Sequence, residues 1–182
     1  GLIRLFQQPV RRELSHHRLS GTAGAPVRLT GEQEQALAEV GEALSARRFE
    51  TFLLAGVTGS GKSEVYLRAA EATLAMGRGA VILVPEIALV PALARAVRER
   101  FGDRLALLHS AMPPAERHQE WERIRSGEAP VVVGPRSAVF APVPDLGLLV
   151  VDEEHDASYK QDQVPRYHAR DTGLIRAREA GA

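Results

Sequence analysis

The 182-residue sequence predicts an α/β protein, with a mostly parallel β-sheet flanked by helices and built around a phosphate-binding loop. Two observations support this fold class. Short apolar segments alternate with helical patterns along the chain, as in sheets whose strands are covered on both faces. In addition, the Gly-rich stretch 56–63 matches the pattern G-x-x-x-x-G-K-[ST] at every fixed position.

Composition narrows the class of protein further. Hydrophobic residues make up 45% and charged residues 25% of the sequence, as is typical of globular proteins. The absence of cysteine excludes disulfides and cysteine-based zinc sites in this chain and is compatible with a reducing cytoplasm. No apolar run approaches the roughly 18 residues of a membrane span, so we expect a cytoplasmic protein with no membrane partner.

The first part of the chain, residues 1–28, differs from the rest. Its five arginines face a single acid, Glu13, and a linker of small residues follows. We expect a basic arm or linker that is the tail of a preceding domain, with the main domain spanning residues 29–182. Two readings stay open: an arm that contacts DNA phosphates, or a solvated arm without a partner.

The main domain opens with a helix that begins after Thr30. Thr30 suits the N-cap, and Gln33 completes a capping box three residues later. A glutamine just upstream of a phosphate loop can also read the two polar edges of adenine. Both roles of Gln33 remain open at this stage.

The phosphate loop is expected to connect a buried strand, 51–55, to a helix, 64–76. Lys62 would reach the β- and γ-phosphates of ATP, and the Ser63 hydroxyl would bind Mg²⁺. Backbone N–H groups of the loop and the helix N-terminus would hold the phosphates. The predicted nucleotide-binding residues are Gln33, Gly56, Val57, Thr58, Gly59, Ser60, Gly61, Lys62 and Ser63.

Four further strands are predicted at 80–84, 105–108, 130–133 and 146–151, with helices at 91–101 and 113–125 between them. Trp121, the only tryptophan, is expected to pack the second of these helices onto the sheet. Loops that follow parallel strands meet at one edge of the sheet and form its ligand crevice. The phosphate loop, the loops that begin at 85, 109 and 134, and residues 152–155 all lie at such ends.

The last strand runs directly into two acids. Asp152 is placed to hold Mg²⁺ through water, and Glu153 to orient and activate the attacking water. We therefore predict Lys62, Asp152 and Glu153 as catalytic residues, with Ser63 and Asp152 as metal ligands. His155 is a weaker candidate, because an exposed histidine in a turn is common.

With these motifs in hand, the sequence resembles a known family. Asp152–His155 form a D-E-x-H box of the superfamily 2 helicases, and several longer runs resemble the primosomal protein N′ (PriA) family of replication-restart helicases: GVTGSGKSEVYL, LVPEIAL, GPRSAVF, DEEHDASYKQ and PRYHARD. Gln33 matches the family's adenine-reading glutamine. Two positions depart from the family, Ser63 and Pro135, each standing where threonine is usual.

The resemblance implies a RecA-like first helicase lobe, ATP-driven 3′-to-5′ DNA unwinding at stalled forks, and replication restart within the primosome. It also implies single-stranded-DNA-binding protein and primosome proteins as partners, and zinc elsewhere in the full-length family. The second lobe with its arginine finger and the Ser-Ala-Thr motif are not found in this sequence. By resemblance, that motif's strand lies between the phosphate-loop strand and the Asp152 strand. We therefore expect a fragment of lobe 1 that is inactive alone.

Aromatic and cationic residues interleave after the acid box. Such residues can stack on bases and pair with phosphates, and the family has an aromatic loop here that links DNA binding to ATP hydrolysis. The alternative is that Tyr159 and Tyr167 pack the loop onto the lobe. The predicted DNA-binding or coupling residues are Arg136, His155, Tyr159, Lys160, Arg166, Tyr167, His168 and Arg170.

Two other functions compete with a helicase lobe. A P-loop phosphotransferase, such as a nucleotide kinase, would need an acceptor site and an arginine-rich lid, and the acid box followed by the aromatic loop argues against it. A non-catalytic module that binds ATP or DNA is the second alternative. The presence of Lys62, Asp152 and Glu153 together counts against that module for the full-length protein, while for this fragment in isolation it stays open.

Overall fold

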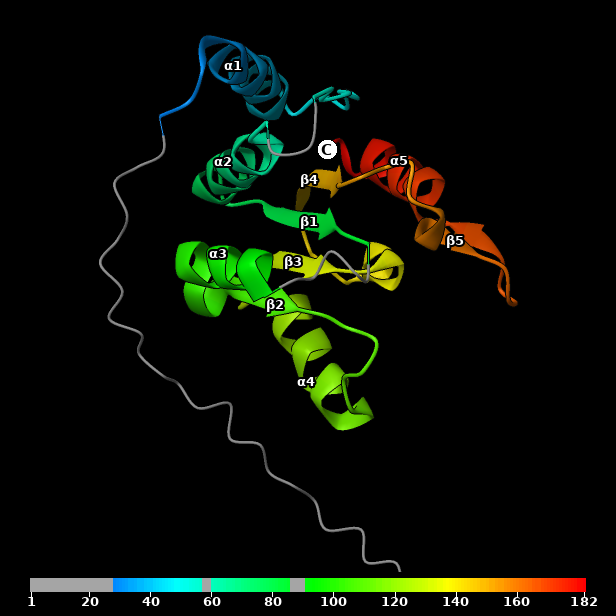
Figure 1. The fold of residues 1–182 in the computed structure, drawn as a ribbon. Helices are drawn as coiled ribbons and strands as arrows, with labels where there is room; N and C mark the ends of the chain where they lie inside the picture. The colour runs from blue at the N-terminus through cyan, green and yellow to red at the C-terminus, as the bar shows by residue number, and fades with distance from the viewer. Residues whose placement is uncertain (1–27, 57–59, 86–90) are drawn as a thin grey trace, which may run out of the picture.

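The computed structural model describes residues 28–56, 60–85 and 91–182. Its centre is a four-stranded parallel sheet with the order β2-β3-β1-β4 (Figure 1). The strands are β1 (Gly79–Leu83), β2 (Leu105–Leu107), β3 (Val131–Gly134) and β4 (Leu146–Val151). They confirm four of the predicted strands and the α/β fold class of a RecA-like helicase lobe.

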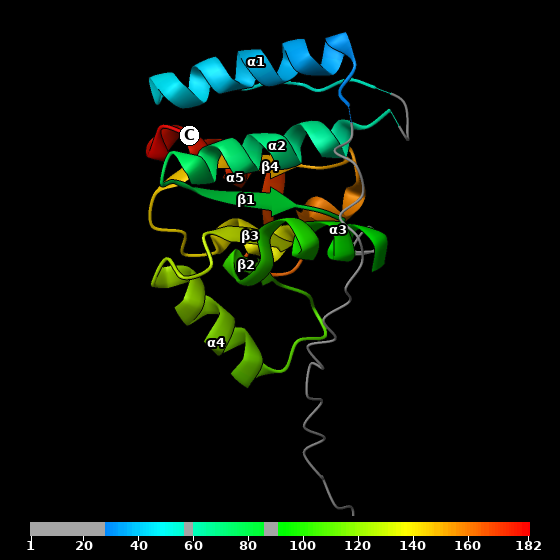
Figure 2. The ribbon, with the colours of Figure 1, turned by 90° about the vertical axis from the view of Figure 1, so that its left-hand side faces the viewer.

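Helices cover both faces of this sheet (Figure 2). One face packs against α2 (Lys62–Ala75) and α3 (Pro91–Phe101), through a core cluster that includes Tyr66, Ile82 and Phe101. The other face packs against α4 (Pro114–Arg125) and α5 (Ala169–Ala180), through a cluster that includes Leu83, Ile124 and Tyr159. α1 (Gly31–Ala46) lies on α2 as an outer layer. Because both faces are covered, every residue of β1 and β3 is buried.

The predicted strand 51–55 is wrong in this structure. The segment is extended but pairs with none of the four strands, and Leu53 is 80% exposed. The reason lies in the sheet: among the described residues, β4 is an edge strand that hydrogen-bonds only with β1. An apolar segment becomes a strand only when another strand completes its backbone hydrogen bonds. None of the described strands pairs with residues 51–55, so this segment stays extended but unpaired.

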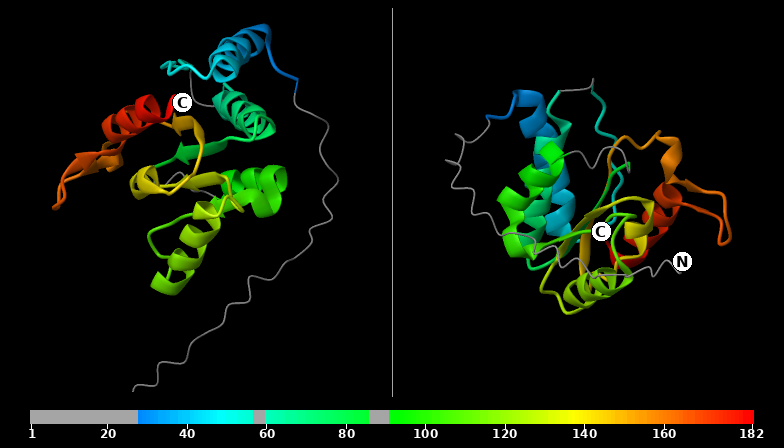
Figure 3. Two further views of the ribbon diagram at one scale, coloured as in Figure 1. Left: turned by 180° about the vertical axis from the view of Figure 1, so that it is seen from behind. Right: turned by 60° about the horizontal axis from the view of Figure 1, so that its bottom comes forward.

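The remaining elements position the segment that follows the acid box. A 3-10 turn, η3 (Arg136–Phe140), follows β3, and another, η4 (Ala157–Tyr159), follows the acids. η4 leads into a small antiparallel ladder of β5 (Lys160–Gln161) and β6 (Tyr167–His168), which projects from the body of the lobe before α5 (Figure 3). The 3-10 helix η2 (Gly102–Arg104) links α3 to β2.

One buried cation ties the C-terminal helix to the sheet. Arg78, only 4% exposed, follows α2 and donates hydrogen bonds to the Asp145 carboxylate and to the carbonyls of Leu146, Ala180 and Gly181. A Cβ atom on Gly147 would lie 2.9 Å from the Arg78 Cβ, so glycine is needed for this close approach. Arg78 thereby fixes the C-terminal end of α5, the helix that follows the β5–β6 ladder.

Candidate nucleotide site

The described ends of the phosphate loop, Gly56 and Ser60, lie close to the first turn of α2. Gly61, its N-cap residue, has φ +81°, a left-handed conformation that favours glycine. Lys62 begins the helix, and its Nζ donates to the Gly56 carbonyl at 2.8 Å across the loop. A Cβ on Gly56 would lie 2.6 Å from Ser60 Oγ, so a side chain at this position would force the serine hydroxyl to rotate away. The predicted binding residues Val57, Thr58 and Gly59 lie outside the described residues.

Gln33 contacts this loop directly. Its side-chain oxygen accepts from the Thr30 N–H at 2.9 Å, and the Thr30 hydroxyl accepts from the Gln33 N–H, which confirms the capping box. The Gln33 amide nitrogen donates to the Ser60 carbonyl at 2.8 Å. The glutamine therefore joins the start of α1 to the phosphate loop. Its adenine-reading role stays a prediction.

Asp152 lies at the end of β4, beside the phosphate-loop helix. Its N–H donates to the Leu83 carbonyl at 2.9 Å, which continues the sheet ladder by one residue. The Tyr66 hydroxyl on α2 donates to Asp152 Oδ2 at 3.2 Å. Burial raises the pKa of Asp152 and the charge of Glu153 adds to the rise, whereas the bond from Tyr66 and the charge of Lys62 oppose it. The acid is thus close enough to Lys62 for their charges to interact.

Glu153 follows in a strained turn that points its acid toward solvent. It has φ +47°, a left-handed conformation rare for residues other than glycine. Its side chain is 40% exposed, and His155 Nε2 lies 3.7 Å from its carboxylate, a long separation for an ion pair. Glu154, in contrast, is paired with Arg170 at 3.0 Å. Of the two neighbouring glutamates, Glu153 is therefore the one suited to meet a water molecule.

These groups fit ATP and Mg²⁺. Mg²⁺ prefers oxygen ligands and is held by one or two protein groups together with phosphates and water, as the Ser63 hydroxyl and the Asp152 carboxylate would allow. Both interact with the same Tyr66 hydroxyl, which places them near each other. Within the described ranges no three His, Cys, Asp or Glu side chains group as a metal cage.

Tyr159 departs from its predicted exposure to DNA. The side chain is fully buried in the core cluster beneath α5, so it cannot stack on a base, and the alternative of core packing holds at this position. Its hydroxyl donates to the Asp152 backbone carbonyl at 2.6 Å. Burial raises the pKa of the Tyr159 hydroxyl far above its ordinary range, so it remains a donor. The predicted aromatic loop therefore touches the acid box through this residue.

Comparison with known proteins identifies the fold family. The model of the DEAD/DEAH box helicases matches residues 30–175. The chain belongs to the DEAD/DEAH box helicase family. Among curated relatives, it is 46% identical to the "Replication restart protein PriA" of Bacillus subtilis over 84% of this chain and 19% of that protein. The corresponding protein of Treponema pallidum is 50% identical over 84% of the chain and 23% of its own length. These matches confirm the resemblance predicted from sequence.

The chain is much shorter than the relatives it matches. The "Replication restart protein PriA" of Synechocystis is 43% identical over 96% of the chain but only 20% of that protein. The chain thus spans about a fifth of the relatives it matches.

No helix in the described ranges is both long and apolar enough to cross a bilayer.

The cationic residues predicted to face DNA lie around the β5–β6 ladder of this helicase lobe. Arg136 donates to the backbone carbonyls of Ser158 and Lys160, each at 3.1 Å, and so braces η4 rather than binding an acid. Lys160 is exposed and pairs with Asp162 at 3.1 Å. Exposed Arg166 donates to the Asp162 carbonyl, and exposed Arg170 pairs with Glu154 and Asp171. DNA binding by these residues stays a prediction.

Tyr167 and His168 are half-buried on β6. The Tyr167 ring meets Phe140 edge-on with 5.0 Å between centroids, so it packs η3 against the ladder and still presents part of its surface. In the described structure, the His168 Nδ1 atom is buried without a hydrogen-bond partner. Of the residues predicted to bind DNA, Tyr159 therefore contacts Asp152, and Arg170 contacts Glu154 of the same acid box.

Sequence reasoning missed Tyr66. A usable signal was its spacing of three residues from Ser63, which places the two side chains on one face of a helix. Its partner Asp152, however, is 86 residues away. Only the fold brings them together.

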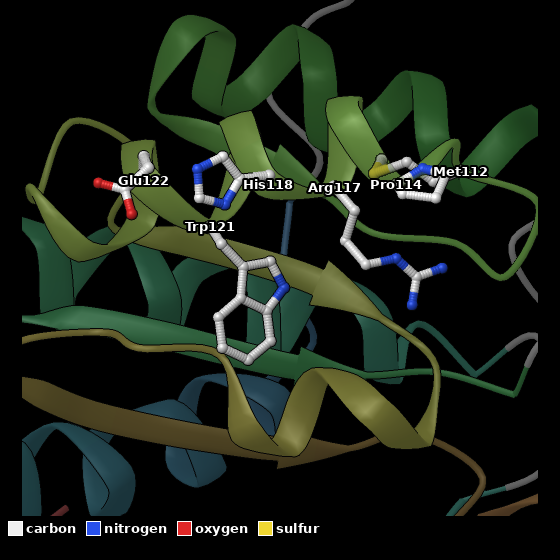
Figure 4. A pocket seen from close by; sticks show the side chains of 6 residues that line it. All are labelled: Met112, Pro114, Arg117, His118, Trp121 and Glu122. Atoms are coloured by element: carbon white, nitrogen blue, oxygen red, sulfur yellow. The ribbon is translucent and has the colours of Figure 1, made fainter.

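A separate hollow lies beside α4, on the sheet face opposite α2 (Figure 4). Trp121 packs against the core there, as predicted from its place in the sequence. Arg117 donates to the carbonyls of His109 and Ser110 and so organises the loop after β2. The residues that line the hollow are Met112, Pro114, Arg117, His118, Trp121 and Glu122. None of them belongs to the phosphate loop or to the acid box. The nucleotide site is therefore assigned from the motif geometry.

Proposed function

We propose that this chain is the ATP-binding lobe of an ATP-dependent 3′-to-5′ DNA helicase that acts at stalled replication forks. The full-length protein would restart replication with primosome proteins and single-stranded-DNA-binding protein, as its resemblance implies. The single observation that carries the enzymatic part is the Tyr66–Asp152 hydrogen bond of 3.2 Å. It joins the phosphate-loop helix to the acid box, so the two halves of an ATP site lie together.

The residues divide the work of hydrolysis. Lys62, at the N-terminus of α2, would contact the β- and γ-phosphates, because its cation lies where a helix end already favours anions. Ser63 and Asp152 would hold Mg²⁺, directly or through water; the bound ion would neutralise charge that develops on the phosphates. Glu153, exposed beside them, would orient the attacking water and accept its proton.

DNA would act on this site through the segment after the acids. Tyr159 holds the Asp152 carbonyl, while Arg136 holds the carbonyls on either side of Tyr159. Single-stranded or forked DNA bound at the β5–β6 ladder would therefore shift η4. Because η4 contacts Asp152 directly, the acid box would move with it. The exposed cations Lys160, Arg166 and Arg170 suit contacts to phosphates.

The phosphotransferase alternative is weaker. A nucleotide kinase would need an acceptor pocket beside the phosphate loop, and the hollow beside α4 lies on the other face of the sheet. A non-catalytic module would not require an exposed acid in a strained turn at the end of β4, as Glu153 is. The geometry favours hydrolysis in the full-length protein.

The test compares two neighbouring glutamates in the full-length protein that contains this chain. Glu153→Gln should keep nucleotide affinity nearly intact and abolish ATP turnover with and without single-stranded DNA, because an amide cannot accept the proton. Glu154→Gln is the matched control, since it removes only the exposed ion pair with Arg170 and should leave basal turnover near normal. Equal loss of affinity and turnover in Glu153→Gln would contradict the assigned role.

A further inference from the structure

Tyr66 is a buried tyrosine whose hydroxyl faces the ATP site. Its side chain is 7% exposed, and the ring packs with Leu67 and Ala70 in the core cluster between α2 and the sheet. Its hydroxyl donates to Asp152 Oδ2 at 3.2 Å and also makes a side-chain hydrogen bond with Ser63. The one polar atom of this core residue therefore reaches both predicted metal ligands.

Packing alone does not explain this hydroxyl. A phenylalanine would fill the same apolar space, whereas burial of a hydroxyl costs free energy unless a hydrogen bond compensates. Thr73, the other buried residue of α2 with a hydroxyl, satisfies that group by bonding to the Ala69 carbonyl of its own helix. The Tyr66 hydroxyl instead donates its hydrogen bond to the Asp152 carboxylate, which lies at the end of β4.

The contact restricts Asp152. The backbone of Asp152 is held by the Leu83 carbonyl on one side and by the Tyr159 hydroxyl on the other. The bond to Oδ2 restricts the side chain, which otherwise could rotate about two bonds. A preorganised ligand loses less freedom when it binds an ion.

We propose that Tyr66 is a positioning residue of the ATP site, whose hydroxyl holds the Asp152 carboxylate and the Ser63 hydroxyl in the arrangement that receives a nucleotide-bound divalent cation. The proposal rests on the proposed function, because it presumes that the site binds Mg²⁺ and nucleotide. In this role the Tyr66 side chain would contact neither the phosphates nor the attacking water itself. It would set the geometry of Ser63 and Asp152, which hold the cation.

The experiment measures equilibrium binding of a fluorescent ADP to the full-length protein, in Mg²⁺ and in EDTA. Tyr66→Phe should lower the Mg²⁺-dependent gain in affinity by about 2- to 10-fold, as expected for loss of one hydrogen bond, and leave affinity in EDTA unchanged. ATP turnover should then require a higher Mg²⁺ concentration. Thr73→Val, which removes a buried hydroxyl from the same helix away from the site, should change neither quantity.

A double-mutant comparison separates positioning from packing. In an Asp152→Asn background, Tyr66→Phe should reduce the Mg²⁺-dependent gain by less than it does alone, because the carboxylate that it positions is gone and only its contact with Ser63 remains. An unchanged gain in the single variant, an equal affinity loss in Mg²⁺ and EDTA, or an additive loss in the double variant would overturn the proposal. Melting curves of all variants show whether each is folded.

Failure of the proposed function has a different signature. Lys62→Ala should abolish nucleotide binding in the same assay if the phosphate loop is the site. If Lys62→Ala binds nucleotide normally, the assigned site is wrong and the role of Tyr66 falls with it. If Lys62→Ala fails to bind while Tyr66→Phe behaves as wild type, only the role of Tyr66 is refuted.

Discussion

Replacement of Tyr159 separates its contribution to the core from its contact with the acid box. Tyr159 is a fully buried side chain in the cluster beneath α5, so Tyr159→Ala should lower the free energy of unfolding by about 3–5 kcal/mol, as for other large buried rings. Tyr159→Phe keeps the ring and removes only the 2.6 Å bond to the Asp152 carbonyl, so the expected loss is about 1–2 kcal/mol. Urea unfolding of the chain, followed by circular dichroism, measures both values.

The functional readout uses the milder variant. In the full-length protein, Tyr159→Phe should reduce DNA-stimulated ATP turnover more than basal turnover, because it leaves the fold and the phosphate loop intact and loosens the link to Asp152. Tyr167→Ala provides the comparison for stability, since its half-buried ring should cost less than Tyr159→Ala. Full DNA stimulation in Tyr159→Phe would refute the coupling argument, and a cost below about 1 kcal/mol for Tyr159→Ala would refute the burial argument.

Two further predictions concern charge. Lys62→Ala should abolish ATP turnover while leaving the melting temperature nearly unchanged, since the lysine is partly exposed at the start of α2. ATP turnover and a melting curve check this together. Burial alone would raise the pKa of Glu64, but hydrogen bonds and charges of Arg100 and Arg68 outweigh it and lower that pKa. The resulting stability is present above the ordinary pKa of 4.5 and is lost as pH falls through the lowered value. Glu64→Gln should therefore cost about 1–2 kcal/mol at pH 7 and progressively less below pH ~4.5, in urea titrations across pH. Glu71→Gln, which breaks a more exposed contact to Arg100, should cost under about 0.5 kcal/mol at either pH, and equal effects of the two variants would contradict the assignment.

The sequence was sufficient where a local rule decides the structure. The strands β1 and β3 are continuous apolar runs because both of their faces are buried, and the capping box at Thr30 depends on residues three apart. The acids after β4 could likewise be predicted from their place at the carboxyl end of a parallel strand. Each of these inferences depends on chain neighbours.

Inference from sequence failed where distant pairing decides. The apolar segment 51–55 has the composition of a strand, but apolarity does not say which strand would pair with it, and the described sheet ends at β4. Tyr159 stands among cations, which suggested stacking on DNA, yet the fold turns its ring into the core. Neither the Tyr66–Asp152 nor the Tyr159–Asp152 contact has a signature in the pattern of the intervening residues.

The backbone at Glu153 favours a chemical role over a structural one. A residue other than glycine at φ +47° costs roughly 1 kcal/mol or more relative to glycine, and the turn itself is closed by the Asp156 N–H bonding to the Glu153 carbonyl, which any side chain would allow. The glutamate gains little in return from the protein, because its side chain is 40% exposed and His155 Nε2 lies a distant 3.7 Å from its carboxylate. A glycine would therefore serve the fold better at this position. What glycine cannot supply is a carboxylate directly after Asp152, and that is the group that the proposed role in ATP hydrolysis requires.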